Sequence, residues 1–267
     1  MKTNILVCGN GPSCEFIDFT RVPKDSKVMR TTMFYSEEKY NAGKRVDYYV
    51  DYAKRLVDQY FNIRTINEKG EYEIDMENTW WTVLLESNPH FPTIRSCTEF
   101  IQKTPLIAEF RCFYEYYYGQ YLPTGMQALA LAVVMGFENI FVAGFDLYSD
   151  PNNLHAFPEL KDVHERMNSY NRTSIYDTTT IISDSTEHIH EQIMKTHPTS
   201  MQIKFINLLS ALFPSTKILS VCNSSPINEH ILLADAIYET PWYQPLAKPC
   251  DRIKDWLPLP ESMPSRE

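Results

Sequence analysis

The sequence is short of basic residues and has no long apolar run. It carries 25 Lys and Arg against 34 Asp and Glu, a net charge of −9. This balance argues against a nucleic acid partner, which needs a basic surface, and against a strong polybasic membrane anchor. No apolar stretch approaches the roughly 20 residues that span a bilayer. Residues 1–4 lead straight into a strand of four apolar residues, without a signal peptide, so we expect a cytoplasmic protein.

Metal and nucleophile motifs are missing as well. The six cysteines form no C-x-x-C pair and no zinc spacing, so we interpret them as small core residues in a reducing compartment. His188 and His190 have no evident third ligand. There is no G-x-S-x-G elbow, no P-loop and no Asp-x-Asp pair that would hold a cation on a nucleotide diphosphate. The sequence predicts neither a metal site nor a bound cofactor.

What is present is enough apolar sequence for one large domain. Hydrophobic residues make up 43% of the 267 positions and charged residues 22%, which predicts a packed globular core. The 17 Tyr and 14 Phe favour surfaces that contact rings or sugars, although aromatic side chains more often fill cores.

Short apolar runs alternate with amphipathic segments along the chain. This pattern is typical of an α/β fold with a parallel sheet, because crossover helices bury both faces of the sheet. The expected strands are residues 4–8, 27–30, 48–50, 80–85, 139–143 and 217–222, and the expected helices are residues 12–19, 53–62, 105–118, 124–135 and 202–212. Residues 149–198 are polar with weak periodicity, which indicates a small lid subdomain. The nucleotide-binding domain would then comprise residues 1–148 and 199–267.

Small and polar residues follow four of the expected strands, at residues 9–13, 31–32, 144–148 and 223–225. Because parallel strands end at one edge of the sheet, these loops can surround one ligand. The first loop reads Gly-Asn-Gly-Pro-Ser and indicates nucleotide or phosphate binding, since small residues let backbone N–H groups approach an anion. It is not the dinucleotide fingerprint, whose third glycine would fall at Cys14. The alternative is a tight turn without a ligand.

His197 is the candidate general base. It ends the polar segment and precedes a helix that starts near Pro198. Imidazole titrates in the range that proton removal from a hydroxyl requires. The alternative interpretation is a solvated histidine before a helix.

The order of these loops resembles the bacterial sialyltransferases of glycosyltransferase family 42. The shared motifs are Gly-Asn-Gly-Pro-Ser at residues 9–13, Tyr-Ser-Glu-Glu-Lys-Tyr at residues 35–40 and Gly-Phe-Asp-Leu-Tyr at residues 144–148, within a resemblance over about residues 3–225. The resemblance implies a Rossmann-like, mostly parallel α/β sheet flanked by helices, a GT-A-like variant with a small lid. It also implies a CMP-sialic acid donor, inversion at the anomeric carbon, no cofactor and no metal.

The resemblance assigns roles to residues of these loops. His197 would be the general base, and Tyr148 would hydrogen-bond the leaving phosphate. The donor and nucleotide contacts would come from the strand ends and from the start of helix 124–135: Gly9, Asn10, Gly11, Ser13, Thr32, Asp51, Tyr52, Thr124, Gly125, Gly144, Phe145 and Asp146.

Several positions depart from the family pattern. Thr32 stands where the family has asparagine, a second family asparagine falls at Asp51 or Tyr52, and Tyr121 aligns with a family arginine. The second phosphate-binding tyrosine falls near His155, and our hypothesis is that His155 takes over its hydrogen bond.

These features lead to the hypothesis of a sialyltransferase that acts on a terminal galactoside of a lipo-oligosaccharide. Such an acceptor would bring the protein to the inner membrane as a peripheral protein, and family analogy implies a homo-oligomer, a tetramer. The alternatives are a transferase for another CMP-activated acidic sugar and a non-catalytic CMP-binding protein, while a dehydrogenase is disfavoured by the missing third glycine. The sequence determines neither the linkage, α2,3 or α2,8, nor the acceptor.

Overall fold

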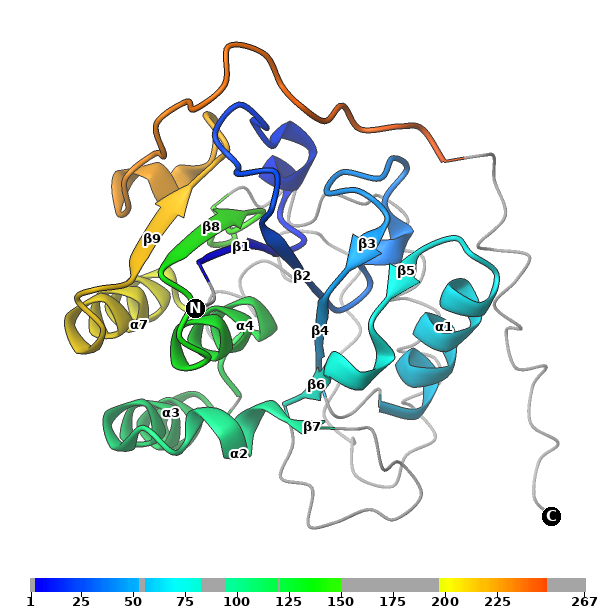
Figure 1. The fold of residues 1–267 in the computed structure, drawn as a ribbon. Coiled ribbons are helices and arrows are strands. Elements are labelled where there is room, and N and C mark those ends of the chain that lie inside the picture. The colour runs from blue at the N-terminus through cyan, green and yellow to red at the C-terminus, as the bar shows by residue number, and fades with distance from the viewer. Residues whose placement is uncertain (1–2, 53–55, 83–94, 120, 150–196, 249–267) are drawn as a thin grey trace, which may run out of the picture.

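The fold is described from a computed structural model, which covers residues 3–52, 56–82, 95–119, 121–149 and 197–248. Its centre is a seven-stranded sheet in which every neighbouring pair of strands is parallel (Figure 1). In spatial order the strands are β7 (Arg95–Ser96), β6 (Thr79–Trp81), β4 (Tyr48–Asp51), β2 (Lys27–Thr31), β1 (Asn4–Cys8), β8 (Asn139–Ala143) and β9 (Lys217–Ser220). A separate parallel pair joins β3 (Arg45–Val46) to β5 (Glu73–Ile74). The predicted α/β class with a mostly parallel sheet is confirmed.

The direction of chain growth reverses beside β1. From β1 the chain builds outward through β2, β4, β6 and β7, and then returns through helices to β8 on the other side of β1. Open α/β sheets bind ligands beyond the carboxyl ends of the strands at such a switch point. A ligand site is therefore expected at the loops after β1 and β8.

Helices cover both faces of the sheet. Those described are α1 (Leu56–Glu68), α2 (Cys97–Ile101), α3 (Pro105–Tyr118), α4 (Thr124–Val134) and α7 (Thr199–Leu212). Alternate residues of β1 point to opposite faces, so Val7 joins the core under α4 while Leu6 joins the core on the other face. Strands buried on both faces appear as continuous apolar runs, which is why the sequence showed them clearly.

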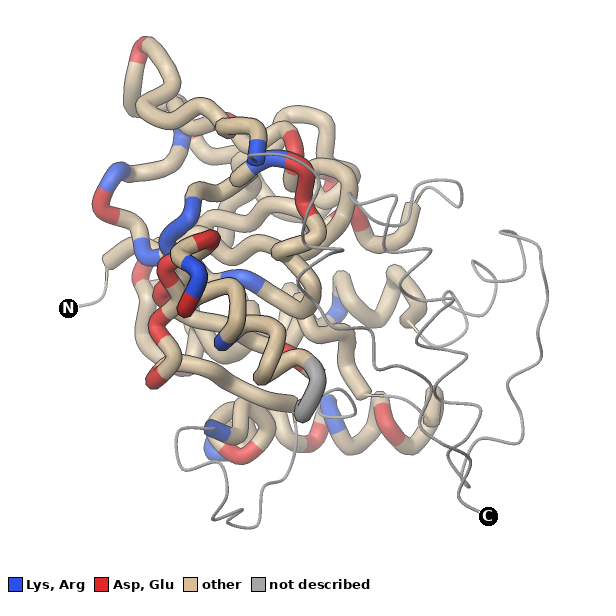
Figure 2. Tube along the Cα trace, turned by 90° about the vertical axis from the view of Figure 1, so that its right-hand side faces the viewer, with Lys and Arg blue, Asp and Glu red and all other residues tan. Residues whose placement is uncertain are grey.

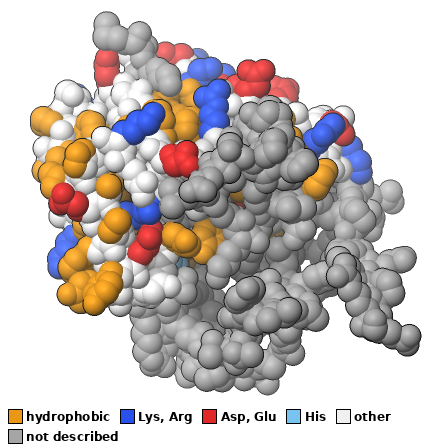
Figure 3. Space-filling model, turned by 90° about the horizontal axis from the view of Figure 1, so that it is seen from below, with side chains coloured by type: hydrophobic (Ala, Val, Ile, Leu, Met, Phe, Trp, Pro, Cys, Tyr) orange, Lys and Arg blue, Asp and Glu red, His pale blue; other side chains and the backbone are white. Residues whose placement is uncertain are grey.

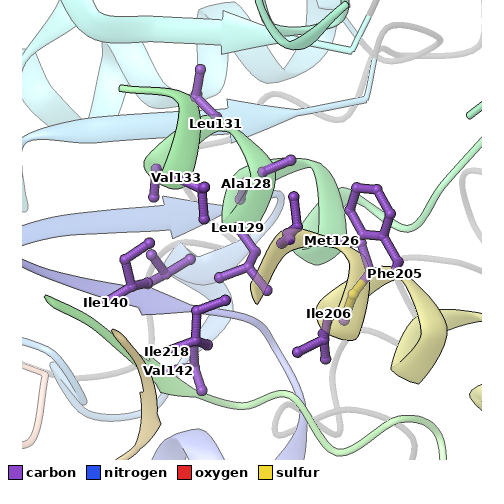
Figure 4. Close-up of a cluster of buried hydrophobic side chains, with 14 of the residues drawn as sticks. Met126, Ala128, Leu129, Leu131, Val133, Ile140, Val142, Phe205, Ile206 and Ile218 are labelled. Carbon is purple, nitrogen blue, oxygen red and sulfur yellow. The ribbon is translucent and has the colours of Figure 1, made fainter. Parts of the chain in front are cut away.

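Helix α4 is the centre of the larger core. Its residues from Met126 to Val133 are all buried, as expected for a helix that is apolar all round. Figure 4 shows Leu129 facing Ile140 and Val142 of β8, with Phe205 and Ile206 of α7 completing the cluster. This packing fixes the start of α4 and the start of α7 relative to the end of β8.

The last part of the described chain, which ends at residue 248, crosses the molecule over the β1–β2 connection (Figure 1). The rings of Trp242 and Tyr243 pack edge-on against Phe19, with centroids 5.1 and 4.9 Å apart. The indole of Trp242 donates to the Val22 carbonyl at 2.6 Å. This stretch packs on the domain without a helix or a named strand up to residue 248.

Charged residues on the described surface are mixed in sign. In Figure 2, basic and acidic positions lie next to each other along the trace. Two of the close contacts are Lys27 with Asp47 and Arg21 with Asp18, both at 2.8 Å. Among the described residues, no helix is long and apolar enough to cross a membrane.

The aromatic residues divide between core and surface. Tyr35, Tyr49 and Tyr72 are almost completely buried, in a second core that also contains α1 residues. In contrast, Phe113 and Tyr116 on the outer face of α3 are 51% and 84% exposed. Figure 3, seen from below, shows hydrophobic side chains at the surface among polar ones.

Several element boundaries differ from the prediction. The predicted helix over residues 12–19 is a shorter 3₁₀ turn, Pro12–Phe16, because the backbone is already extended at Ile17. The predicted helix over residues 53–62 is α1, which continues to Glu68. The predicted strand 80–85 is described only to its end at Trp81 and the following Thr82. The predicted lid, residues 149–198, lies outside the described residues apart from its ends.

Candidate active site

The loops after β1 and β8 are hydrogen-bonded to each other. The backbone N–H of Gly9 donates to the Ala143 carbonyl at 2.8 Å, and that of Gly11 donates to the Gly144 carbonyl at 2.9 Å. The Gly144 N–H returns a hydrogen bond to Oγ of Ser13 at 3.1 Å. Two loops that are more than 130 residues apart in sequence thus form one unit at the switch point.

Asp146 connects a third loop to this pair. One of its carboxylate oxygens accepts from the backbone N–H of Ser13 at 2.6 Å, and the other accepts from Oγ of Ser225 at 2.7 Å. Hydrogen bonds to a carboxylate are among the stronger ones in proteins. Asp146 therefore holds the loops together, a role that the sequence did not indicate. Its implied contact with the nucleotide stays a prediction.

The glycines of these loops are required by close approach of the two backbones. A Cβ at Gly9 would collide with the Gly144 carbonyl, and Gly144 itself has a φ of +69°, which favours glycine. A Cβ at Gly11 would lie 2.6 Å from Oδ2 of Asp146 and 2.8 Å from the Gly144 oxygen. The glycine pattern thus reflects loop packing as well as room for a ligand.

We expect Gly11→Ala to weaken both the fold and nucleotide binding. The added methyl must displace the Asp146 carboxylate or the Gly144 backbone, and overpacking of this kind costs about 1–3 kcal/mol. Differential scanning fluorimetry with and without CMP would measure the loss of Tm and of the CMP-induced shift. Gly125→Ala is the control for Tm alone, since its Cβ would meet only the Phe145 ring, at 3.3 Å, and a ring edge can move more easily than backbone. Equal Tm values for the two variants would contradict the packing argument.

Backbone strain is concentrated in the same loops. Among the described residues, the non-glycine positions with positive φ are Thr32 at +45°, Leu147 at +54° and Tyr148 at +56°. Such conformations cost free energy and gather at binding and catalytic sites. Thr32 follows β2, and Leu147 and Tyr148 follow β8, so all three lie at the carboxyl edge of the sheet.

The β2 loop is attached to the β1 loop through Asn10. Its Nδ2 donates to Oγ1 of Thr32 at 2.5 Å and to the Thr31 carbonyl at 3.2 Å. Its Oδ1 is buried and has no hydrogen-bond partner among the described residues. A buried amide oxygen without a partner is costly, which fits a position that a ligand completes.

Asp51 and Tyr52 lie two strands away from β1, at the end of β4. The Asp51 carboxylate accepts from the Tyr49 hydroxyl and, at 2.6 Å, from the Tyr52 backbone N–H. The Tyr52 ring lies 5.6 Å from that of Tyr121, and burial raises the pKa of Tyr52 to about 12. These contacts join Tyr52 to the segment before α4, and their roles toward a donor stay predictions.

Helix α4 begins at this edge of the sheet. Thr124 is the first helical residue and not its cap, because Pro123 occupies the cap position and supplies no side-chain hydrogen bond. Gly125 in the first turn lies against the buried ring of Phe145. The β8 loop therefore packs directly on the start of α4, and it brings Thr124, Gly125 and Phe145 to the edge of the sheet where Gly144 lies.

His197 lies immediately before α7 and next to the β8 loop. Its ring stacks on the ring of Tyr148, with centroids 6.0 Å apart and an interplanar angle of 20°. The hydroxyl of Tyr114 is 3.2 Å from its Nδ1. Its carbonyl accepts from Nε2 of Gln202 at 3.0 Å, and Thr199 at the start of α7 donates to the Leu147 carbonyl at 2.9 Å. The histidine is thus held against the candidate site and is not a solvated side chain without contacts.

Tyr148 is suited to donate a hydrogen bond. Burial raises the pKa of Tyr148 above its usual value, so the phenol stays protonated at neutral pH. Its backbone has a φ of +56°, a strained conformation for a residue other than glycine.

The structure thus brings together most of the residues that the sequence singled out, at the carboxyl ends of β1, β2 and β8. His155, His188 and His190 lie outside the described residues. Tyr114 was missed as a site residue, because a contact with a distant segment leaves no local signal in the sequence. Ser225 lies in the loop over residues 223–225 that was expected at this edge, but its hydrogen bond to Asp146 was not predicted. Within the described ranges, no group of three or more His, Cys, Asp or Glu residues could hold a metal ion.

Comparison with known proteins agrees with this geometry. A family model for alpha-2,3-sialyltransferase (CST-I) matches residues 3–261. The chain is similar to the crystal structure of the monofunctional alpha-2,3-sialyltransferase Cst-I of Campylobacter jejuni, with 24% identity and a TM-score of 0.76 over 98% of this chain and 90% of that chain. It is also similar to CstII of Campylobacter jejuni with the substrate analogue CMP-3FNeuAc, with 21% identity and a TM-score of 0.68 over 92% of this chain and 91% of that chain. A third similar structure is the sialyltransferase CST-II with a trisaccharide acceptor and CMP, with 22% identity and a TM-score of 0.69 over the same two shares. No curated protein matches the sequence.

At these identities the structural similarity establishes the fold, which is shared with known sialyltransferases. The family model covers nearly the whole chain, including every described loop of the site. The chain therefore belongs to the alpha-2,3-sialyltransferase (CST-I) family and is a glycosyltransferase.

Proposed function

We propose that this glycosyltransferase moves sialic acid from CMP-sialic acid to a terminal galactoside of a lipo-oligosaccharide, with inversion and without a metal. The observation that carries the proposal is the imidazole of His197 stacked on the phenol of Tyr148 beside the β1–β8 switch point. The similar CstII structures hold CMP, a CMP-sialic acid analogue and a trisaccharide acceptor, which supports a sugar nucleotide donor and a glycan acceptor for this chain.

In the proposed reaction, the acceptor hydroxyl oxygen attacks the anomeric carbon while its proton passes to His197. The bond between that carbon and the phosphate oxygen breaks, and CMP leaves with the electron pair. Attack from the face opposite the phosphate inverts the configuration. Because CMP leaves as a phosphate monoester, neutral donors such as the Tyr148 hydroxyl can stabilise its developing charge without a cation. His155 is proposed as a second donor, and the turnover of His155→Ala and His155→Tyr would test it.

The direct test is transfer in the presence of EDTA. With CMP-sialic acid and lactose, we expect CMP and sialyllactose to appear in equal amounts, and CMP release to be faster with lactose than without it. Digestion of the product with an α2,3-specific sialidase would assign the linkage. Binding of CMP without any release would point to a non-catalytic CMP-binding protein, and a requirement for added cation would contradict the metal-independent step.

A transferase for another CMP-activated acidic sugar is the second candidate. It is favoured by Thr32, which stands where the family has an asparagine. The Thr32 hydroxyl accepts a hydrogen bond from Nδ2 of Asn10. Competition between CMP-sialic acid and a second CMP-linked acidic sugar would separate the two donors. Peripheral attachment to the inner membrane and a homotetramer also belong to the proposal, and vesicle flotation and light scattering would test them.

A further inference from the structure

A buried tyrosine lies at the Nδ1 edge of His197. Tyr114 is on the inner face of α3 and is 0% exposed, and its hydroxyl is 3.2 Å from Nδ1. Its ring packs against that of Tyr118 one turn later, with centroids 4.9 Å apart. The two partners are 83 positions apart in sequence, so the contact exists only because α3 packs against α7.

The histidine is contacted on three sides. Tyr114 lies at one ring nitrogen, the ring of Tyr148 covers one ring face, and Gln202 holds the backbone carbonyl. The contacts with Tyr114 and Tyr148 restrain the ring itself, and the hydrogen bond from Gln202 restrains the backbone that carries it. A hydrogen bond at Nδ1 is also what decides which ring nitrogen carries the proton in neutral histidine.

The direction of that hydrogen bond has a chemical consequence. Burial above all, with Tyr148 and Tyr118 nearby, raises the pKa of Tyr114, so its hydroxyl is neutral at working pH. A neutral hydroxyl can either accept a hydrogen bond from Nδ1–H or donate one to an unprotonated Nδ1. In the first case Nε2 is unprotonated and can accept a proton, whereas in the second case Nε2 already carries one.

We propose that Tyr114 is a positioning residue, whose hydroxyl oxygen accepts the Nδ1–H of His197 and fixes the tautomer in which Nε2 receives the acceptor's proton. The inference rests on the proposed function only in the role of His197 as the base. A carboxylate in this place would orient the ring and also stabilise the imidazolium by its charge. Tyr114 orients the ring without supplying a full negative charge.

The test compares Tyr114→Phe, which removes one buried hydroxyl, with Tyr118→Phe as the matched control on the same helix. The ¹⁵N NMR signals of the His197 ring, assigned by their absence in His197→Gln, report the tautomer at a pH where the imidazole is neutral. We expect the Nδ1–H form in the wild type and in Tyr118→Phe, and a mixture of both forms in Tyr114→Phe. We also expect kcat of Tyr114→Phe to fall by about 10- to 100-fold, because a misdirected base loses its alignment, with the KM for CMP-sialic acid within about twofold of wild type.

An Nε2–H form in the wild type would overturn the proposal, and so would wild-type kcat in a folded Tyr114→Phe. If Tyr114→Phe fails to fold, the wild-type tautomer alone decides. These outcomes remain distinct from failure of the proposed function. A wild type that transfers no sugar, or a His197→Ala variant with full activity, would refute the assigned reaction while the NMR result still reports the Tyr114 contact.

Discussion

Alanine in place of His197 is expected to lower kcat for transfer by about 10²- to 10⁴-fold, the usual contribution of a positioned general base. The KM for CMP-sialic acid should change little, because the base acts on the acceptor hydroxyl and not on the nucleotide. Initial rates of sialyllactose formation would measure kcat and KM, and the CMP-induced shift in Tm would report donor-site integrity. The loss should be in kcat, since proton transfer contributes in the transition state and not in the bound ground state.

The matched control is His230→Ala, which removes an exposed histidine after the turn at residues 226–229. We expect this variant to keep wild-type kcat and Tm. Full activity in a folded His197→Ala variant would mean that another group acts as the general base. Loss of the CMP-induced shift along with activity would instead show that His197 supports the donor site.

A double variant connects this prediction to Tyr114. If Tyr114 acts only through His197, then adding Tyr114→Phe to His197→Ala should lower kcat no further. Residues that act as one unit give strongly non-additive effects, whereas independent residues give effects that multiply. A further loss in the double variant would mean that Tyr114 also acts on something other than His197.

The fold was predictable because its strands are buried on both faces. The runs at residues 4–8 and 139–143 are continuous and apolar, and they form the adjacent strands β1 and β8. Once a parallel sheet is expected, the topological rule brings the loops after these strands to one edge. The proximity of Gly9, Gly11 and Gly144 therefore followed from local patterns together with one general rule.

The contacts that organise the site could not be predicted in the same way. Asp146 with Ser225, and Tyr114 with His197, are pairs that the fold creates between distant segments. No period or spacing marks such partners, since each residue would look the same in sequence if its partner were elsewhere. The two-residue strands β3, β5 and β7 were missed for another reason, because alternation cannot be recognised over two positions.

The β2 loop shows how a distant network supports the site. Arg30 of β2 and Glu37 form an ion pair at 2.6 Å in which both side chains are fully buried. The guanidinium also lies over the Phe34 ring, and the Tyr72 hydroxyl donates to Glu37 at 2.9 Å. Burial opposes the charge of Arg30, but Glu37 outweighs it, so the pKa of Arg30 lies above its usual value. The pair spans residues 31–36 and so holds in place the strained Thr32 that contacts Asn10.

Arg30→Met is therefore expected to be the most destabilising substitution considered for this chain. It leaves the Glu37 carboxylate buried without its counter-charge, and breaking a buried pair in this way costs about 3–5 kcal/mol. Urea unfolding followed by circular dichroism would measure the loss. The control is Arg64→Met, because the Arg64–Glu68 pair on α1 is 54% and 63% exposed and water screens it.

The decisive comparison is Arg30→Met with the double variant Arg30→Met and Glu37→Met. Removing both charges takes away the desolvation cost together with the attraction, so the double variant should be clearly more stable than Arg30→Met alone. Its CMP-induced shift should nevertheless stay below that of the wild type, because residues 31–36 lose the link that fixes Thr32. A double variant as unstable as Arg30→Met would mean that packing of the long side chains, and not charge compensation, is what the pair supplies. A folded double variant with a wild-type CMP-induced shift would mean that the Arg30–Glu37 pair does not support the donor site.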